Sequence, residues 1–494
     1  MTNTTEWITR SVSRLRSGAP STDKAPKASK PAADKQVADG AATKVPAPRS
    51  THERLQATLR RGNESLSPRA LRRLLADLQD VVAPQVSELE GGRRAQVVAG
   101  WYGQAEPEER RDMWLLLCEQ FAPDATRFQS ARQRYEAAAG TADEGQAEIS
   151  LRRALVSPRT RLMQRFAVFP EGMRFLVDMR AELLPQLKAD KRLLALDAEL
   201  EDLFSTWFDV GFLELQRISW HSPAALVEKL IKYEAVHDIK SWADAKNRLD
   251  EGRRCYAFFH PRLPGEPLIF VEVALLQGMA DSITPLLDEE GAADDLDKAT
   301  TAIFYSISNT QTGLKGVSFG DSLIKRVVEE LKGEFPQLKV FATLSPIPGL
   351  RAWLGKNAEA VLQAMPPRAR QALARQLGQP ELEASALLKA LDGVPELGEK
   401  SALRRWLLGA AARYLGRDLD ARGRPLDAVA RFHLGNGARV ERLNWLGDPS
   451  PKGLKQSYGL MVNYLYDLKR LDKHRALLAQ GKVPVSGAME SLQD

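Results

Sequence analysis

The chain after residue 50 opens with the apolar spacing of amphipathic helices. From about residue 51 to residue 207, apolar side chains recur three and four positions apart, as at Leu71, Leu74, Leu75 and Leu78. This spacing places them on one helix face, and the interspersed charges fit solvated faces. We interpret residues 51–208 as a helical bundle for support or oligomerisation.

Two serine-proline pairs mark helix starts within this bundle. Ser67-Pro68 and Ser157-Pro158 each offer a serine N-cap followed by a proline. The missing N–H of proline costs nothing in the first helical position. The pairs therefore predict helices that begin at Pro68 and Pro158.

The pattern changes near Gly211, where runs typical of β-strands begin. They are rich in aromatic and β-branched residues and are separated by Pro/Gly turns: GFLELQRISW, RCYAFFHPRL, EPLIFVEVALL, TAIFYSIS and KVFATLS. Between the last two runs, DSLIKRVVEELKGEF has the apolar stripe of a helix, made by Leu323, Ile324, Val327, Val328 and Leu331. The order of strand, glycine loop, helix and strand predicts a βαβ unit.

Another helical stretch follows from about residue 356 to residue 415. After it, RFHLGNGARVERLNWLGD predicts a return to strand structure with a Gly-Asn-Gly turn. A helical insertion therefore separates Ser345 from His433 in the sequence, and tertiary folding must reunite them if they cooperate.

Charge and hydropathy narrow the functional classes. The 494 residues carry a net charge of +6, and residues 1–50 alone hold nine basic and four acidic side chains. We interpret residues 1–50 as a disordered basic tail rather than a targeting signal, because Asp23, Asp34 and Asp39 break the acid-poor pattern of transit peptides. The near-neutral remainder argues against nucleic acid as a partner. No apolar run approaches the roughly 20 residues of a membrane span.

The two cysteines, Cys118 and Cys255, lie far apart in apolar stretches. This fits buried thiols in a reducing compartment better than a disulfide framework. No spacing of metal ligands is visible, so we expect no metal site.

A glycine-containing loop, NTQTGLKGVSFGDSLIKR, leaves one predicted strand and opens a helix. Gly313, Gly316 and Gly320 permit the close backbone approach with which N–H groups hold phosphate oxygens. The loop matches neither G-x-x-x-x-G-K-[ST] nor a clean G-x-G-x-x-G. Taken alone, it fits a pyrophosphate site and a plain connector equally well.

Ser345 and His433 are the candidates for chemistry. Ser345 precedes a Pro-Ile-Pro-Gly turn in FATLSPIPGLRAWL, which favours an extended backbone at the serine. That pattern fits either a strand exit or a prepared site. His433 can exchange a proton near neutral pH, although a lone histidine is more often structural.

Several blocks, taken together and in order, resemble the malonyl-CoA decarboxylase family. They are QRISWHSPAALVEKLIKYEAVH, HPRLPGEPLIFVEVAL, TAIFYSISNTQTGLKGVSFG, LIKRVVEELKGEFPQLKVFATLSPIPGLRAWL, RFHLGNGARVERLNWLGD and YGLMVNYLY. The resemblance implies an α+β fold, in which the helical bundle precedes a mixed α/β catalytic domain over residues 209–494. That domain would resemble the CoA-dependent N-acetyltransferase (GNAT-like) fold, with a helical insertion at about 356–415.

The resemblance also implies the site residues. The serine of the S-P-I-P-G motif and the histidine of the F-H-L-x-N-G-A motif form the family's catalytic pair, which gives Ser345 and His433 here. Substrate contacts are implied for both of them, for Tyr466 of NYLYD, and for the loop residues Lys315, Gly316, Val317, Ser318, Phe319, Gly320 and Asp321. The chain departs from some members at Ser318, where they carry glutamate.

The implied activity is the conversion of malonyl-CoA to acetyl-CoA and CO₂ without a cofactor. An enolate would be stabilised by backbone donors of the loop and protonated by His433. The alternative is an acyl-CoA-dependent acyltransferase of the GNAT class, and a third interpretation is a helical assembly protein with a degenerate CoA site. We also expect a cytoplasmic location and a homo-oligomer, either a dimer or a tetramer.

Overall fold

The computed structural model describes residues 49–289, 295–317, 323–379 and 381–492. The predicted basic tail lies almost wholly outside the described residues, as do the predicted substrate contacts Ser318, Phe319, Gly320 and Asp321. Residues Arg49–Asp494 form one structural unit. No helix among the described ranges is long and apolar enough to cross a membrane.

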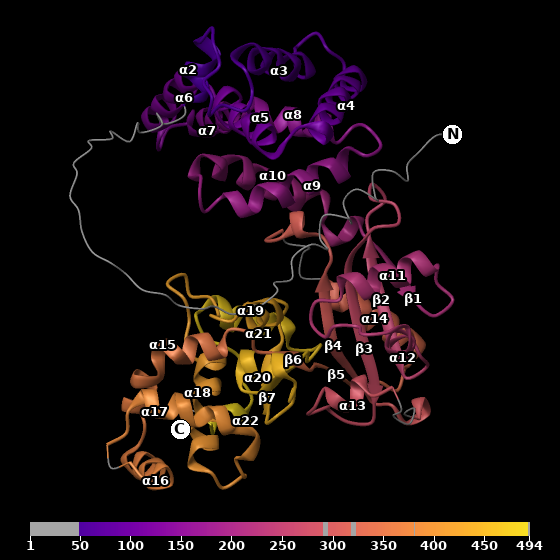
Figure 1. Cartoon of the computed structure of the whole chain (residues 1–494), viewed down its shortest axis with the longest axis vertical. Coiled ribbons are helices and arrows are strands. Elements are labelled where there is room, and N and C mark those ends of the chain that lie inside the picture. The colour runs from indigo at the N-terminus through magenta and orange to yellow at the C-terminus, as the bar shows by residue number, and fades with distance from the viewer. Residues whose placement is uncertain (1–48, 290–294, 318–322, 380, 493–494) are drawn as a thin grey trace, which may run out of the picture. The chain divides into compact units, whose positions relative to one another are not determined.

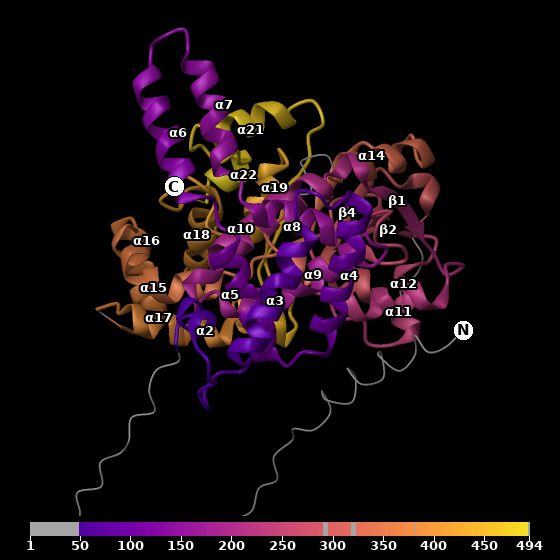
Figure 2. The same ribbon diagram turned by 90° about the horizontal axis from the view of Figure 1, so that it is seen from above.

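The first part of this unit is helical, as the apolar spacing predicts (Figure 1). Ser67 accepts a hydrogen bond from the N–H of Ala70, and Ser157 accepts one from Thr160, so both predicted N-caps are confirmed. Helices α6 and α7 run side by side as a hairpin (Figure 2). The helices of this part are α2 (Thr51–Gln56), α3 (Pro68–Val81), α4 (Glu88–Gln104), α5 (Pro107–Gln120), α6 (Ala125–Ala138), α7 (Glu144–Leu155), α8 (Pro158–Phe166), α9 (Gly172–Leu183) and α10 (Leu194–Trp207).

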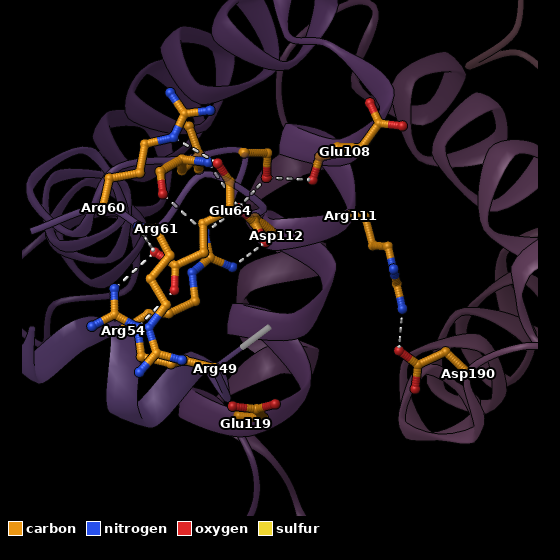
Figure 3. A network of polar contacts seen from close by, with 12 residues as sticks. Arg49, Arg54, Arg60, Arg61, Glu64, Glu108, Arg111, Asp112, Glu119 and Asp190 are labelled. Carbon is orange, nitrogen blue, oxygen red and sulfur yellow. Dashed lines mark hydrogen bonds and ion pairs between the residues drawn. The ribbon is translucent and has the colours of Figure 1, made fainter. Parts of the chain in front are cut away.

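Some charges of this helical part are buried, so the predicted solvated faces do not account for all of them. Arg54 donates two hydrogen bonds of 2.6 Å to the carboxylate of Asp112, and both side chains are buried (Figure 3). Asp112 also accepts hydrogen bonds from the hydroxyl of Ser65 and the N–H of Leu66. A buried ion pair of this kind joins α2, α5 and the segment before α3.

An eight-stranded mixed sheet occupies the second part, in the order β1-β2-β3-β4-β5-β8-β6, with β7 paired to β8. The pairs β1–β2, β2–β3 and β3–β4 are antiparallel, β4 and β5 are parallel, and β8 is antiparallel to β5, β6 and β7. The strands are β1 (Glu214–Ile218), β2 (Arg253–Phe259), β3 (Pro267–Leu276), β4 (Thr301–Asn309), β5 (Val340–Thr343), β6 (Ser345–Pro346), β7 (Arg439–Asn444) and β8 (Met461–Leu465).

The parallel pair β4 and β5 is joined through helix α14 (Leu323–Glu334), so the predicted βαβ unit is confirmed. All five apolar residues of the predicted α14 stripe are buried. Alternating residues of β3 serve the two faces of the sheet: Val271 belongs to the core that includes α14, and Phe270 to the core of α11 and α12. These two helices span Ala224–Tyr233 and Trp242–Arg248.

The two parallel strands do not stay together along their whole length. Pairing of β4 with β5 ends at Phe304 and Thr343, yet β4 continues to Asn309. The chain that leaves β5 turns into β6, which pairs with β8 instead. The sheet therefore opens between the end of β4 and β6, beside Ser345.

A helical insertion follows β6 and gathers on one side of the sheet (Figure 1). It comprises α15 (Leu350–Gln363), α16 (Pro367–Leu377), α17 (Ala384–Ala390) and α18 (Ala402–Gly416). The α+β architecture with a helical insertion is thus confirmed.

The segment around His433 differs from its prediction as strand. Residues Ala428–Gly435 form helix α19, and only Arg439–Asn444 of the predicted run is a strand, β7. Asp427 caps α19 by accepting hydrogen bonds from the N–H groups of Val429 and Ala430. This cap starts a helix where the apolar run alone suggested extended backbone.

The remaining helices are short. They are α13 (Thr284–Leu287), α20 (Pro451–Ser457), α21 (Leu471–Ala479) and α22 (Gly487–Glu490). Both cysteines are free thiols; Cys255 is buried and Cys118 partly buried. Burial raises the pKa of Cys118 to about 11, so this thiol has little thiolate character near neutral pH.

Candidate active site

A cavity of about 500 Å³ lies where the sheet opens between β4 and β6. Its size falls within the range of small-molecule sites. Ser345, at the start of β6, and His433, on α19, both line it, together with residues from the end of β4. The described lining residues are Val236, Ile269, Phe304, Tyr305, Ser306, Ile307, Asn309, Val317, Leu323, Ser345, Pro346, Ala428, Val429, Phe432, His433, Gly435 and Asn436.

None of these described lining residues is aspartate, glutamate, lysine or arginine. Most of the wall is aliphatic or aromatic, and the polar groups are hydroxyls, amides and one imidazole. An anionic group that enters such a space exchanges part of its hydration for neutral groups and meets no cation among the described lining residues. The cavity therefore destabilises a carboxylate more than a neutral acyl group.

Ser345 is held by β6 and by its neighbour in the extended chain. Its pairing with Val462 of β8 fixes the backbone, and its hydroxyl donates to Thr343 Oγ1 at 2.8 Å. Thr343 is fully buried, and its Oγ1 also accepts the N–H of Tyr464 at 3.1 Å. The serine side chain thus points into the cavity from a rigid base.

His433 lies beside Ser345 although 88 positions separate them in the chain. Its Nε2 is 3.2 Å from the Oγ of Ser345, and its Nδ1 is 2.7 Å from the hydroxyl of Tyr466. The ring also stacks on Tyr464, with ring centroids 4.7 Å apart. The alcohol and the imidazole therefore reach one cavity, as the motif pairing predicts.

The surroundings of Tyr466 assign the tautomer of His433. Tyr466 is buried, and among the described residues its hydroxyl has only His433 Nδ1 as a hydrogen-bond partner. A buried hydroxyl that donated to nothing would cost free energy, so Tyr466 donates and Nδ1 accepts. In the neutral ring the proton then resides on Nε2, which faces Ser345 and the cavity.

Burial lowers the pKa of His433 to about 3. Charging the ring would require desolvation of the imidazolium in a cavity without a described counter-ion. The imidazole is therefore neutral in the free protein near neutral pH. Burial likewise raises the pKa of Tyr466 above its ordinary value, so this phenol keeps its proton.

Asp427 connects the helix that carries His433 to the turn that follows Ser345. Besides capping α19, its Oδ2 accepts the N–H of Gly349 at 3.2 Å, in the turn that follows Ser345, and the hydroxyl of Tyr414 at 3.3 Å. A Cβ on Gly349 would lie 2.2 Å from the Tyr414 hydroxyl, so only glycine fits this approach. Burial raises the pKa of Asp427 against the opposing effect of these hydrogen bonds.

Of the other predicted site residues in the described structure, only Val317 lines the cavity. Lys315 and Gly316 are exposed and are not among its described lining residues. Ser318, Phe319, Gly320 and Asp321 lie outside the described residues. Tyr466 lies behind His433 rather than on the cavity wall, so its contact is with the imidazole.

Two contributors were missed by the sequence analysis. Thr343 carried a usable signal, because residues two apart in an extended chain share a face and Ser345 was already expected to be extended. Asp427 also carried one, since an aspartate before an apolar helical run is a common N-cap.

Comparison with known proteins identifies relatives over most of the chain. Residues 211–493 match the family model of the malonyl-CoA decarboxylase C-terminal domain, and residues 121–208 match that of the malonyl-CoA decarboxylase N-terminal domain. The mitochondrial malonyl-CoA decarboxylase of Mus musculus is 38% identical over 400 residues, which cover 76% of this chain and 80% of that protein. The mitochondrial malonyl-CoA decarboxylase of Rattus norvegicus is 37% identical over 406 residues, with the same coverage of 76% and 80%.

Solved structures agree with these relatives. The crystal structure of malonyl-CoA decarboxylase from Rhodopseudomonas palustris is 41% identical, with a TM-score of 0.73, and the match covers 85% of this chain and 99% of that one. That from Agrobacterium vitis is 39% identical, with a TM-score of 0.73 and coverage of 85% and 100%.

Proposed function

This chain belongs to the malonyl-CoA decarboxylase family, whose reaction yields acetyl-CoA and CO₂, and we propose that it catalyses this reaction in the cavity shared by Ser345 and His433. The observation that carries the proposal is the 3.2 Å contact of these two side chains on the wall of a cavity without described charged residues. Such a site suits the loss of a carboxylate followed by a proton transfer.

Cleavage of the C2–carboxylate bond leaves an electron pair on C2 that moves into the thioester carbonyl. The thioester thus accepts the electrons itself, and the proposal includes no cofactor. The charge begins on the carboxylate and ends spread over the enolate, while CO₂ leaves as a neutral molecule. The apolar wall favours this change, because it destabilises the compact anion more than the delocalised one.

Ser345 is proposed to orient the malonyl group. Its hydroxyl can turn from Thr343 and donate a hydrogen bond to a carboxylate in the cavity, while pairing with β8 keeps its backbone in place. Holding the carboxylate so that the breaking bond stands perpendicular to the thioester plane aligns that bond with the carbonyl π system. Orientation of this kind lowers the entropic part of the barrier.

His433 is proposed to protonate C2. The ring is neutral in the free protein, and a malonyl carboxylate beside it would favour the charged form, so substrate binding takes up a proton. The proton taken up adds at Nδ1 while the Tyr466 hydroxyl turns to accept from it, and Nε2 delivers its own proton to C2 of the enolate. The ring is then neutral with its proton on Nδ1, and proton exchange with solvent restores the Nε2–H tautomer set by Tyr466. One solvent proton is consumed for each acetyl-CoA formed.

The carrier is proposed to lie along the open edge of β4. From Tyr305 to Asn309 this strand borders the cavity, beyond its last pair with β5. An extended arm that contains amides, such as pantetheine, can hydrogen-bond to such an edge. We propose that the exposed Lys315, two residues before the lining residue Val317, contacts the phosphates.

Two of the backbone N–H groups in the loop are already hydrogen-bonded and are not free to stabilise the enolate. In the described part of the loop, the N–H of Lys315 already donates to Thr312 and that of Val317 to Leu314. The N–H groups of Lys315 and Val317 therefore stabilise the turn of the loop. The proposal therefore leaves the donor role to groups other than these two.

An acyltransferase and a decarboxylase differ in whether turnover of malonyl-CoA requires an acceptor. Acceptor-free incubation with malonyl-CoA yields acetyl-CoA and CO₂ in equal amounts if the chain is a decarboxylase. A transferase requires an amine acceptor, and a degenerate site binds the thioester without turnover. Absence of CO₂ release from folded protein would overturn the proposal. The comparisons support the decarboxylase.

Homo-oligomerisation and a cytoplasmic location stay predictions. Helix α7 and the residue after it expose Ile149, Leu155 and Val156, which are apolar residues that a second copy of the chain can cover. We propose this surface for self-association. Sedimentation velocity across a concentration series tests it, and localisation of the tagged protein in its host tests the location.

A further inference from the structure

The guanidinium group of Arg180, on α9, holds the backbone of the loop that leaves β4. Its Nη1 donates to the carbonyl oxygens of Gly313 and Lys315 at 2.8 and 2.9 Å. Its Nε and Nη2 donate to Asp197 and Glu201 at 2.8 and 3.1 Å, and the side chain is only 1% exposed. A planar guanidinium with this many acceptors has little freedom to rotate. The loop backbone on both sides of residue 314 is therefore fixed to the helix.

Two more contacts join α9 to the same loop. A Cβ built on Gly313 would lie 1.9 Å from the carbonyl oxygen of Val177, so loop and helix touch without a side chain between them. One turn earlier on α9, Arg174 Nη1 donates to Gln311 Oε1 at 2.8 Å. The three α9 positions are three residues apart and thus follow one helix face.

The fixed loop leads directly into the cavity wall. Gly316 follows Lys315 with a φ of 85°, a conformation that favours glycine. Val317 follows it and lines the cavity with Ser345 and His433. A displacement of the loop at Gly313 therefore moves this part of the wall.

We propose that α9, chiefly through Arg180, is the positioning element that sets the affinity of the cavity for the CoA carrier. This rests on the proposed function, in which the chain around Lys315 contacts CoA. Arg180 does not line the cavity among the described residues, so it acts through the loop. Ser345 and His433 stand on other elements, β6 and α19. Disturbing α9 should therefore weaken carrier binding more than it slows C–C cleavage.

The sharpest test compares two glycine substitutions. Gly313→Ala forces the loop away from Val177, whereas Gly278→Ala meets nothing within 4 Å, and neither glycine has a positive φ. We expect Gly313→Ala to raise the KM for malonyl-CoA and the Kd for CoA, measured by calorimetry, about tenfold, with kcat changed by less than about threefold. Gly278→Ala should match the wild type. The malonyl thioester of N-acetylcysteamine, which lacks the nucleotide, should show little change.

Arg180→Lys and Glu201→Gln extend the test without a steric clash. Lysine at position 180 retains the charge but cannot make the several directed hydrogen bonds of the guanidinium group. The Glu201 side chain is partly exposed, so Glu201→Gln tests the same hydrogen-bond network even if Gly313→Ala does not fold. Both variants should raise the Kd for CoA while their circular dichroism stays normal. The increase should be smaller for Glu201→Gln than for Arg180→Lys.

Unchanged Kd values in the folded variants would overturn the proposal, and so would a fall in kcat with KM unchanged. Failure of the proposed function gives a different pattern, because the wild type would then release no CO₂ while the CoA binding comparison still reports on α9. The variant Lys315→Glu tests the proposed phosphate contact independently of α9. If it leaves the Kd for CoA unchanged, the phosphate role of that lysine fails.

Discussion

The hydroxyl of Ser345 lies 2.8 Å from that of Thr343, and Thr343 Oγ1 in turn accepts the N–H of Tyr464. The serine is therefore held by a buried side chain that does not itself line the described cavity. A residue with this placement affects the direction of the Ser345 hydroxyl without contacting substrate.

Thr343→Val removes this hydroxyl while keeping the shape of the side chain. We expect kcat to fall about tenfold with little change in KM, because the serine loses its partner and samples other rotamers. Thr343→Ser should restore most of the rate in steady-state assays of CO₂ release. Equal rates for the valine variant and the wild type would contradict the positioning role.

Ser345→Ala and His433→Ala each remove one member of the proposed catalytic pair. Turnover should fall by roughly 10² to 10⁴, the range typical of lost acid–base or orienting groups. Circular dichroism checks that each variant folds. Ser457→Ala and His260→Ala change buried residues outside the described cavity and serve as matched controls. Near-normal turnover in either test variant would remove that residue from the mechanism.

Tyr466→Phe removes the donor that sets the tautomer of His433. The expected result is a fall in kcat of about tenfold, since Nε2 no longer carries the proton in every molecule. Tyr464→Phe is the matched control, because its buried hydroxyl has no hydrogen-bond partner in the described structure. That control should keep its rate and unfold at the same or a higher temperature. Similar losses in both variants would argue for packing instead of tautomer control.

Buried histidines should weaken the fold as the pH falls. Burial lowers the pKa of His237 to about 4 and that of His433 to about 3, from an ordinary value of 6.5. Below pH 6.5 the unfolded chain binds protons that the folded chain does not, so stability declines by at most about 1.4 kcal/mol per pH unit for each histidine until the pH approaches the folded-state pKa. Urea unfolding at about pH 7 and about pH 5 measures this slope.

The variant His237→Gln isolates one of these protons. It should reduce the pH dependence by the share of a single histidine. A slope equal to that of the wild type would show that His237 binds its proton in the folded protein.

Asp112→Ala breaks the buried ion pair with Arg54. The arginine then stays in the interior without its partner, which typically costs about 3 to 5 kcal/mol. A lower midpoint of thermal unfolding is expected, while the KM for malonyl-CoA in the remaining folded protein stays constant. The exposed pair of Arg132 and Glu136 is the control, and Glu136→Ala should change stability by less than about 1 kcal/mol.

Much of the fold follows from local patterns. The α14 stripe and the two serine caps depend on neighbours in sequence, and the structure confirms all of them. Strand β8 was not identified as a strand by its pattern. It crosses the sheet between β5 and β6 and contributes the buried Asn463, so burial on two sides replaces the alternation that marks a half-exposed strand.

Other features depend on contacts that no local pattern contains. Arg54 and Arg180 look like surface charges in sequence, because their carboxylate and carbonyl partners lie elsewhere in the chain. The meeting of Ser345 and His433 was inferred from family motifs rather than from spacing. Their common cavity requires the sheet to open beside β6, which is a property of strand pairing over long sequence distances.

The hydrogen bond from the N–H of Gly349 to Asp427 closes the helical insertion at its base. The two ends of the insertion are held next to each other, and α15 and α18 also contact α20, β7 and α22, so the insertion is a closed loop that packs on the rest of the domain. The entropy of closing such a loop changes only slowly with its length. A change of length in the connections between its helices should therefore cost little closure entropy and leave the contact of Gly349 with Asp427 in place.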